Sequence, residues 1–271
     1  MKRIFELSIL TFKEGVRDRA LAGILIIIVL MLFITILVTS LFGHELGKVL
    51  VDLNLSALAF AGLLMTFFVN INLIAKDIDK RTIYCVLSKP LSRTEYILGK
   101  YLGLMMLVFV SLSLLMLISS GVVAVQKAIH SPEYFKDFYW GCFLQAYFYE
   151  ILMFMILNAV VVFFSSITTS SFITLLFSVA TYITGQTVEE IIKFFQNEAT
   201  VTQMPSKFHQ MIITAAEYVF PNFSAFDIKI LSSHGTLMSF AHTITITGYS
   251  FIYTAFLLFF AALIFSKREF N

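Results

Sequence analysis

One carboxylate lies inside an otherwise uncharged apolar run, and it is the first residue whose type and place suggest chemistry. Glu150 is the only acidic residue well within the long apolar segments of the sequence. An ionisable side chain in hydrocarbon is costly, and such groups often relay protons or bind cations. The alternative is that Glu150 reaches water near the end of its segment or pairs with another helix. We expect that alternative, because proton-coupled carriers often have an internal repeat and we find none here.

Amide side chains are the other polar groups within apolar runs. Asn70, Asn72 and Asn158 each stand among apolar residues. In membrane bundles such amides often form hydrogen bonds between helices, and we interpret these three in that way. Asn158 shares its apolar run with Glu150, so Glu150 and Asn158 together form the candidate polar site inside the membrane.

Histidine, methionine and cysteine are the candidate metal ligands, and their pattern is weak. His234, Met238 and His242 are spaced by four, so on a helix they would share one stripe, and His with Met suits soft metals. Histidine is also common at membrane interfaces, so we predict no metal site. Cys85 and Cys142 are too few for a disulfide scaffold.

No motif for covalent chemistry or nucleotide binding is complete. Glu189 and Glu190 resemble the start of the Glu-Glu-x-x-x-Arg motif of intramembrane CAAX-type proteases, but Phe194 stands where the Arg belongs. The stretch from Gly43 to Lys48 is one residue too short for a phosphate-binding loop and lacks the final Ser or Thr. We therefore expect no catalytic residue and no cofactor bound by this chain.

The elements that must position these residues are membrane-spanning helices. The 271 residues are 59% hydrophobic and 13% charged, with 30 Phe, a composition typical of a chain whose solvent is lipid. A helix of about 20 apolar residues spans a bilayer. The charge pattern predicts an all-α membrane protein with six spans, at residues 20–42, 55–75, 101–126, 141–164, 171–187 and 244–265.

The distribution of cations predicts the orientation. If both termini are cytoplasmic, 13 of the 19 Lys and Arg residues lie on the cytoplasmic side, most of them in residues 1–19 and 76–100. Cytoplasmic loops carry an excess of such residues. We therefore expect both termini inside the cell, and Cys85 and Cys142 on opposite sides of the membrane.

Two extramembrane segments show helical periodicity. Residues 1–19 have Phe5, Ile9, Phe12 and Val16 at helical spacing, which predicts an amphipathic helix lying in the cytoplasmic interface. Residues 188–243 form the one large outer segment. It is too apolar for a free soluble domain, so we expect short helices packed on the outer leaflet.

The loop at residues 76–100 combines several cations with residues that end and start helices. It holds six of the 19 cations. Pro90 ends or bends a first helical piece, and Ser92-Arg93-Thr94-Glu95 has the form of a capping box that starts the next helix. Gly99 and Gly103 leave a notch where another helix can approach closely. This combination predicts a stiff hairpin that converts a push on the loop into a tilt of the helices.

The same loop resembles that of a transporter family. The stretch KDIDKRTIYCVLSKPLSRTEYILGKYLG, residues 76–103, is similar to the loop of ABC-2 type permeases, the membrane subunits of ATP-binding-cassette exporters, with the NosY-like branch the most similar. The layout also resembles that family: an elbow helix, six spans, a coupling loop between spans two and three, and an outer segment before span six. Many members have Gly before the Thr of this helix, whereas Arg81 precedes Thr82 here.

The resemblance implies a function as the permease subunit of an ATP-driven exporter in a bacterial or archaeal cytoplasmic membrane. Two permease chains, identical or related, would pair with two copies of a separate ATPase subunit that binds ATP and Mg, and no nucleic acid is involved. An ion-coupled secondary transporter using Glu150 and an intramembrane enzyme are the alternatives. By position, the residues implied to dock the ATPase are Asp77, Lys80, Arg81, Thr82, Tyr84, Ser88, Lys89, Pro90, Ser92 and Arg93.

Overall fold

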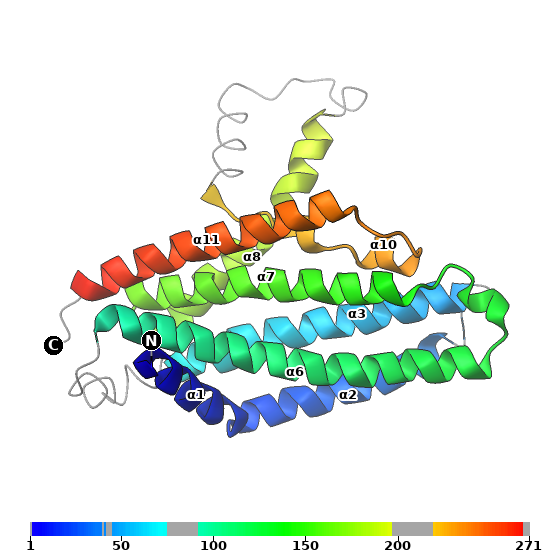
Figure 1. Cartoon of the computed structure of the whole chain (residues 1–271), viewed down its shortest axis with the longest axis horizontal. Helices are drawn as coiled ribbons and strands as arrows, with labels where there is room; N and C mark the ends of the chain where they lie inside the picture. The colour runs from blue at the N-terminus through cyan, green and yellow to red at the C-terminus, as the bar shows by residue number, and fades with distance from the viewer. Residues whose placement is uncertain (1, 40, 42–44, 75–91, 197–218, 268–271) are drawn as a thin grey trace.

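Long helices make up most of the described part of this computed structural model (Figure 1). The structure describes residues 2–39, 41, 45–74, 92–196 and 219–267, and no strand occurs among them. The helices are α1 (Lys2–Val16), α2 (Arg19–Thr39), α3 (Leu46–Leu64), the π-helix η2 (Met65–Asn70), α6 (Arg93–Ile129), η3 (Pro132–Phe135), α7 (Trp140–Ile167), α8 (Ser171–Gln196), η4 (Ser224–Phe226), α10 (Lys229–Ser233) and α11 (Phe240–Lys267).

Five helices of the described chain are long and apolar enough to cross a bilayer. They are α2, the continuous helix Leu46–Ile74 that contains α3 and η2, α6, α7 and α11. At about 1.5 Å per residue, even the 21 residues of α2 cover a hydrocarbon core of about 30 Å. The described residues therefore have the architecture of a helical membrane protein. The predicted span at residues 171–187 lies within α8, which is not among these five helices.

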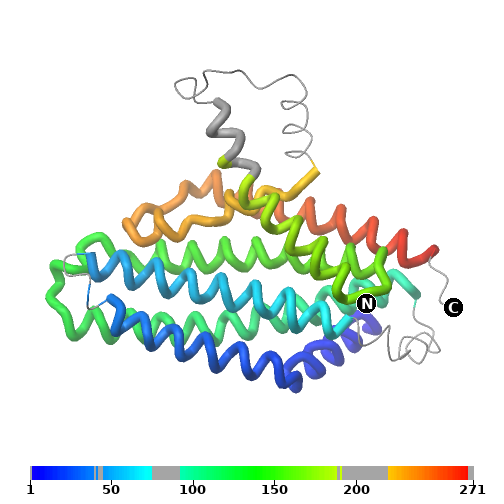
Figure 2. The backbone as a smooth tube through the Cα atoms, turned by 180° about the vertical axis from the view of Figure 1, so that it is seen from behind, coloured from blue at the N-terminus to red at the C-terminus, as the bar shows by residue number. Residues whose placement is uncertain are grey.

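The two ends of the bundle differ in what they hold. In Figures 1 and 2 the long helices run side by side, and both termini lie at one end, which we call the N-terminal end. The connection from α6 to α7 and the short helix α10 lie at the opposite end, here called the far end. α8 starts near the N-terminal end and runs obliquely to the other helices in both views.

The helices extend beyond the predicted spans. α6 begins at Arg93 and ends at Ile129, whereas residues 101–126 were expected to be apolar enough to span. The helix after α2 begins at Leu46 rather than near residue 55. The predicted second span began too late because Lys48 and Asp52 interrupt the apolar pattern. A helix can nevertheless extend beyond the hydrocarbon core, where its charged side chains meet water or other charged groups.

Burial divides the helices into central and peripheral ones. In α7, 78% of the most apolar 18-residue window is buried within the protein, compared with 28% in α2 and 33% in α11. α7 is thus the central helix, whereas α2 and α11 present apolar side chains outward. Exposed residues of α2 include Ile26, Ile27, Leu30, Phe33, Ile34 and Leu37. This outward apolar surface is typical of helices whose solvent is lipid.

The predicted N-terminal amphipathic helix is present as α1, and it packs on α6. Its buried residues are Leu7, Ser8, Thr11 and Gly15, a mostly small face that allows close approach. Phe5 and Val16, from the predicted apolar stripe, remain exposed. α1 therefore has two working faces, one against the bundle and one free to contact lipid.

Candidate functional site

The predicted ATPase-docking segment falls largely outside the described residues. Asp77, Lys80, Arg81, Thr82, Tyr84, Ser88, Lys89 and Pro90 belong to residues 75–91, which the structure does not describe. Ser92 and Arg93, at the exit of this segment, are described. The predicted capping box is confirmed: the Ser92 hydroxyl accepts from the Glu95 backbone N–H at 3.2 Å, and the Ser92 N–H donates to Glu95 Oε2 at 2.8 Å.

Arg93 joins the start of α6 to the end of α11. Its Nη1 donates to the backbone oxygens of Phe265 at 3.2 Å and Ser266 at 3.0 Å. The last carbonyls of a helix lack partners within the helix and carry partial negative charge, so a guanidinium there is favourable. Nearby, the rings of Tyr96 and Phe265 stack with centroids 5.4 Å apart. The first turn of α6 and the last turn of α11 are therefore fastened together.

Gly99 and Gly103 lie where α1 approaches α6 most closely. A Cβ atom built on Gly99 would come within 2.7 Å of a Leu7 methyl group. On Gly103 it would lie 2.6 Å from Thr11 Cβ and 2.7 Å from the Ser8 carbonyl oxygen. Real Cβ atoms do not tolerate such distances, and a backbone oxygen cannot simply rotate away. α1 therefore packs into the notch formed by the two glycines.

A buried charge lies beside this notch. Lys100 is 4% exposed, and its Nζ lies 3.8 Å from Glu14 Oε2 of α1. Removing a buried cation from water is costly unless a carboxylate compensates it. α1 therefore supplies both the packing surface and one counter-charge for the start of α6.

The environment of Glu150 differs from the expectation that this side chain reaches water or pairs with another helix. It lies in α7 and is 4% exposed, and neither carboxylate oxygen has a hydrogen-bond partner among the described residues. No described Lys or Arg lies within ion-pair distance of it. The sequence placed Glu150 correctly inside an apolar run but could not show that the folded chain leaves it without a direct partner.

A polar pocket surrounds Glu150. It is small and partly open, with a volume of about 20 Å³ that has room for about one water-sized group, and it is lined by Ala59, Ala146, Glu150, Met153, Tyr182, Gln186, Phe226, Asp227, Ile228 and Lys229. These residues come from α3, α7, α8 and the segment that leads into α10. Lys229 Nζ lies 3.0 Å from Asp227 Oδ2. Burial disfavours the charge on Lys229, but Asp227 and Glu150 outweigh it and raise the lysine pKa above its usual value.

The sequence did not indicate which residues line the pocket together with Glu150. Tyr182, Gln186, Asp227 and Lys229 lie between 32 and 79 positions further along the chain. No spacing rule connects them to α7. The closeness of Asp227 and Lys229 in sequence was the one available signal, and it indicates only a local ion pair.

The predicted amide pair is confirmed for Asn70 and Asn158. Asn70 Nδ2 donates to Asn158 Oδ1 at 2.5 Å, and Asn158 Nδ2 donates to the Phe154 carbonyl oxygen at 2.9 Å. Asn70 ends the π-helix η2, and such bulges often occur at functional positions. Asn72 is exposed, so the expectation that it also bonds between helices is wrong.

A second buried amide was not singled out from the sequence. Asn54 Nδ2 donates to Thr35 Oγ1 at 3.2 Å, and Ser119 Oγ donates to Asn54 Oδ1 at 2.9 Å. These bonds join α2, α3 and α6. Asn54 lies before the predicted start of its span, which is why the pattern did not place it within the membrane.

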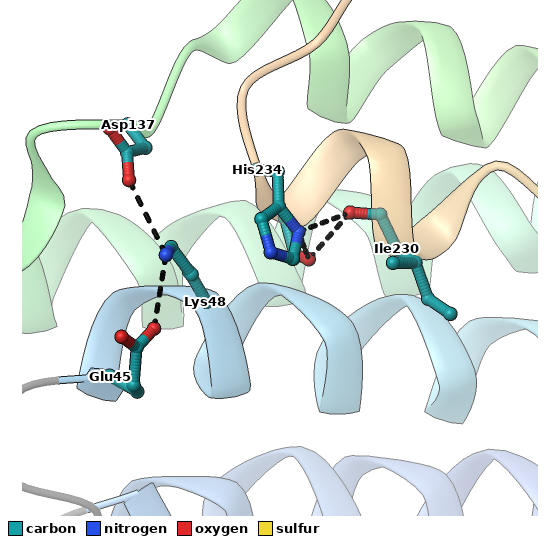
Figure 3. Close-up of polar contacts among 6 residues, drawn as sticks. Glu45, Lys48, Asp137, Ile230 and His234 are labelled. Carbon is teal, nitrogen blue, oxygen red and sulfur yellow. Dashed lines mark hydrogen bonds and ion pairs between the residues drawn. The ribbon is translucent and has the colours of Figure 1, made fainter.

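At the far end, the proposed His234, Met238 and His242 stripe is wrong. α10 ends at Ser233 and α11 begins at Phe240, so no helix runs through these three residues. His234 Nδ1 lies 2.9 Å from the Ile230 carbonyl oxygen, as Figure 3 shows. His242 instead lies 3.1 Å from the Tyr149 hydroxyl. Among the described residues, no group of three His, Cys, Asp or Glu side chains is placed to hold a metal ion.

Polar bonds fasten the segments of the far end to the bundle. Lys48 lies 3.1 Å from Glu45 and 3.6 Å from Asp137, and so bridges the start of α3 to the turn before α7 (Figure 3). Gln145 exchanges two hydrogen bonds with the Met238 backbone, at 2.9 and 3.1 Å. The start of α11 is therefore anchored on α7.

Comparison with known proteins adds no relative. No protein-family model matches the sequence, and no curated protein matches it either. Any statement on function consequently depends on the residues and the geometry described above.

Proposed function

We propose that this chain is the permease subunit of an ATP-driven ABC-2 type exporter, coupled to a separate ATPase. The observation that carries the proposal is the mechanical connection at the exit of the basic loop. The loop ends in a capping box that starts α6 without slack, and Arg93 fastens that start to the end of α11. A force on residues 76–91 would reach two long helices at once.

The elbow helix extends this connection. α1 sits in the notch at Gly99 and Gly103, and Glu14 compensates Lys100. A tilt of the first turns of α6 must therefore move α1 or break these contacts. Interiors packed this closely transmit displacement rather than absorb it, which suits a device driven by an external motor.

The fifth span of the proposed layout is α8, which adds to the five helices described above. Its buried polar residues are spaced along one face: Thr174, Ser178 and Thr181. Phe172, Leu176 and Ile183 point outward and are exposed. Small polar residues inward and large apolar residues outward are typical of a helix between protein and lipid. With α8 included, both termini lie on the same side, which the cation distribution assigns to the cytoplasm.

Isolation of the complex tests the proposal. The full chain, tagged at its C-terminus, is expressed in its native host and purified from membranes in mild detergent. We expect an ABC ATPase subunit to co-purify in equal amount and to hydrolyse ATP. The matched variant Lys80→Glu/Lys89→Glu, which reverses loop charges, should lose that subunit. Purification of the wild-type chain without any ATPase would contradict the proposal.

Thiol labelling tests the orientation. In a Cys142→Ser background Cys85 is the single thiol, since the sequence contains two cysteines. A membrane-impermeant maleimide should label Cys85 in inverted vesicles and leave it unlabelled in intact cells. Labelling from outside the cell would invert the topology and remove the loop from the reach of an ATPase.

An ion-coupled secondary transporter is the second candidate, and one observation favours it. Glu150 is buried without a direct partner, as ion-binding carboxylates of carriers often are. Such a carrier would purify without an ATPase subunit. An ion gradient, rather than ATP, would drive the transport of its cargo. The isolation experiment above therefore distinguishes the two candidates.

A further inference from the structure

The pocket around Glu150 combines a buried, unpartnered carboxylate with space beside it. Glu150 is 4% exposed and its two oxygens accept no hydrogen bond. A carboxylate taken out of water in this way costs several kcal/mol unless something compensates it. The pocket offers space in which a compensating group can lie against the carboxylate.

The charges near the pocket do not balance. Lys229 forms its ion pair with Asp227, 3.0 Å away, and not with Glu150. Lys229 and Asp227 also act electrostatically on Asp52 of α3 as well as on Glu150. Among the described residues, three carboxylates thus share one lysine, so the cluster has more acidic than basic side chains.

The neutral groups that line the pocket suit a hard cation. Gln186 Nε2 is directed to the Tyr182 hydroxyl at 3.3 Å and to the Met153 sulfur at 3.9 Å. No described group donates to the Gln186 amide oxygen, which leaves it available as a ligand. One carboxylate with amide, hydroxyl and water oxygens is a poor set for zinc or calcium, which need more anionic or imidazole ligands.

We propose that Glu150 is the anionic ligand of a small monovalent cation, such as Na⁺, bound in the pocket between α7, α8 and the segment 226–229. Gln186 and Tyr182 complete its shell together with water. This inference does not rest on the exporter function, because it follows from the charge and burial of the pocket alone.

Cation binding would add a further link between three parts of the chain. Glu150 belongs to α7, Gln186 and Tyr182 belong to α8, and Asp227 and Lys229 precede the last helix. The cation compensates Glu150 and, through the shared ligands, draws α8 toward α7. Its presence should therefore stabilise the folded chain as any ligand of the native state does.

The test is the thermal stability of the full chain, purified in detergent, as NaCl replaces choline chloride at constant ionic strength and pH. We expect the Tm of the wild type to rise saturably with Na⁺, by about 5–10 °C at a hundred-fold excess over Kd. Glu150→Gln, nearly the same shape without the charge, should abolish the rise. Glu133→Gln, an exposed carboxyl on the turn before α7, should retain it.

Three results would overturn the proposal. They are an absence of any Na⁺ dependence in the wild type, an equal dependence in all three proteins, and a Tm that follows pH but not the identity of the cation, which would assign a proton to Glu150. If Glu150→Gln does not fold, Glu150→Asp replaces it. A displaced carboxylate should raise the midpoint of the Na⁺ titration at least about ten-fold, and an unchanged midpoint would count against the site.

Discussion

Two buried charges of this molecule are treated in opposite ways. Lys100, at the N-terminal end, is 4% exposed and meets Glu14 of α1 at 3.8 Å. Glu150, in the half of α7 nearer the far end, is equally buried and meets no direct partner. The first charge has a carboxylate partner across the interface of α1 and α6, although it also lines a small pocket. The second lines a pocket and has no direct partner among the described residues, which is the basis of the cation proposal.

The two charges also differ in how tightly the helices beside them are packed. Beside Lys100, Gly99 and Gly103 bring α1 and α6 so close together that neither glycine has space for a methyl group. Around Glu150, larger side chains leave a pocket with polar groups directed to one another. Close packing thus characterises the N-terminal end, whereas the pocket leaves space for the ligand that we propose.

The largest expected effect comes from filling the notch. Gly103→Leu places a side chain where a Cβ alone would lie 2.7 Å from the Ser8 carbonyl oxygen. We expect α1 to detach, with loss of at least about 3 kcal/mol of stability and little folded protein after mild heating. Gly121→Leu on the same helix is the control, because a Cβ there meets nothing within 4 Å. Equal recovery of the two folded variants by size-exclusion chromatography would contradict the claim that α1 packs tightly against Gly103.

The next effect contrasts the two charges directly. Glu14→Gln removes a counter-charge of Lys100, and we expect a loss of about 1–3 kcal/mol, reduced because Glu14 is itself partly exposed. Glu150→Gln in choline buffer should lose nothing or gain stability, because it removes a charge that is buried without a partner. Thermal unfolding of both variants measures the contrast. Destabilisation of similar size in both would show that Glu150 has a partner after all.

A smaller effect is expected at the cap of α11. Arg93→Gln loses two charge-assisted hydrogen bonds to the backbone of Phe265 and Ser266. The contact is partly exposed, so we expect about 1–1.5 kcal/mol. Arg19→Gln, an exposed residue at the start of α2, serves as the control. Hydrogen exchange should show earlier opening of the last turn of α11 in the first variant only, and unchanged exchange would argue against the cap.

The smallest effect is expected for the hydrogen-bonded pair of Asn70 and Asn158, which involves no charge. A double-mutant cycle with Asn70→Ala and Asn158→Ala measures the bond between α7 and the π-helix η2. Hydrogen bonds between membrane helices average about 0.6 kcal/mol and reach about 1.7 kcal/mol. We expect a coupling in that range from thermal unfolding. A coupling of zero would mean that the 2.5 Å contact adds no stability.

The fold could be predicted from the sequence where one signal suffices. Long apolar runs predicted α2, α6, α7 and α11, because a helix needs about 20 apolar residues to cross a bilayer. The capping box at Ser92 was readable because its two bonds join residues three positions apart. The start of the second long helix was missed, because Lys48 and Asp52 interrupt the apolar run although the helix continues through them.

The candidate site could be predicted only in part, because its partners are distant in sequence. Glu150 was found from its own position, but Lys229 reaches the same pocket after 78 further residues. Arg93 was assigned to a docking surface, whereas two of its bonds go to the end of α11. The helical periodicity of the sequence revealed the apolar stripe of α1. It did not reveal that a different face of α1, made mostly of small residues, packs against the glycines of α6.

The most direct test of the exporter account is ATP turnover of the assembled complex with a variant loop. Arg93 is kept intact because it caps α11, and Lys80→Glu/Lys89→Glu carries the charge reversal. In reconstituted vesicles we predict that the wild-type complex hydrolyses ATP in a way that depends on the permease, and that the variant either fails to assemble or hydrolyses ATP independently of it. Identical assembly and identical turnover in both complexes would contradict the account.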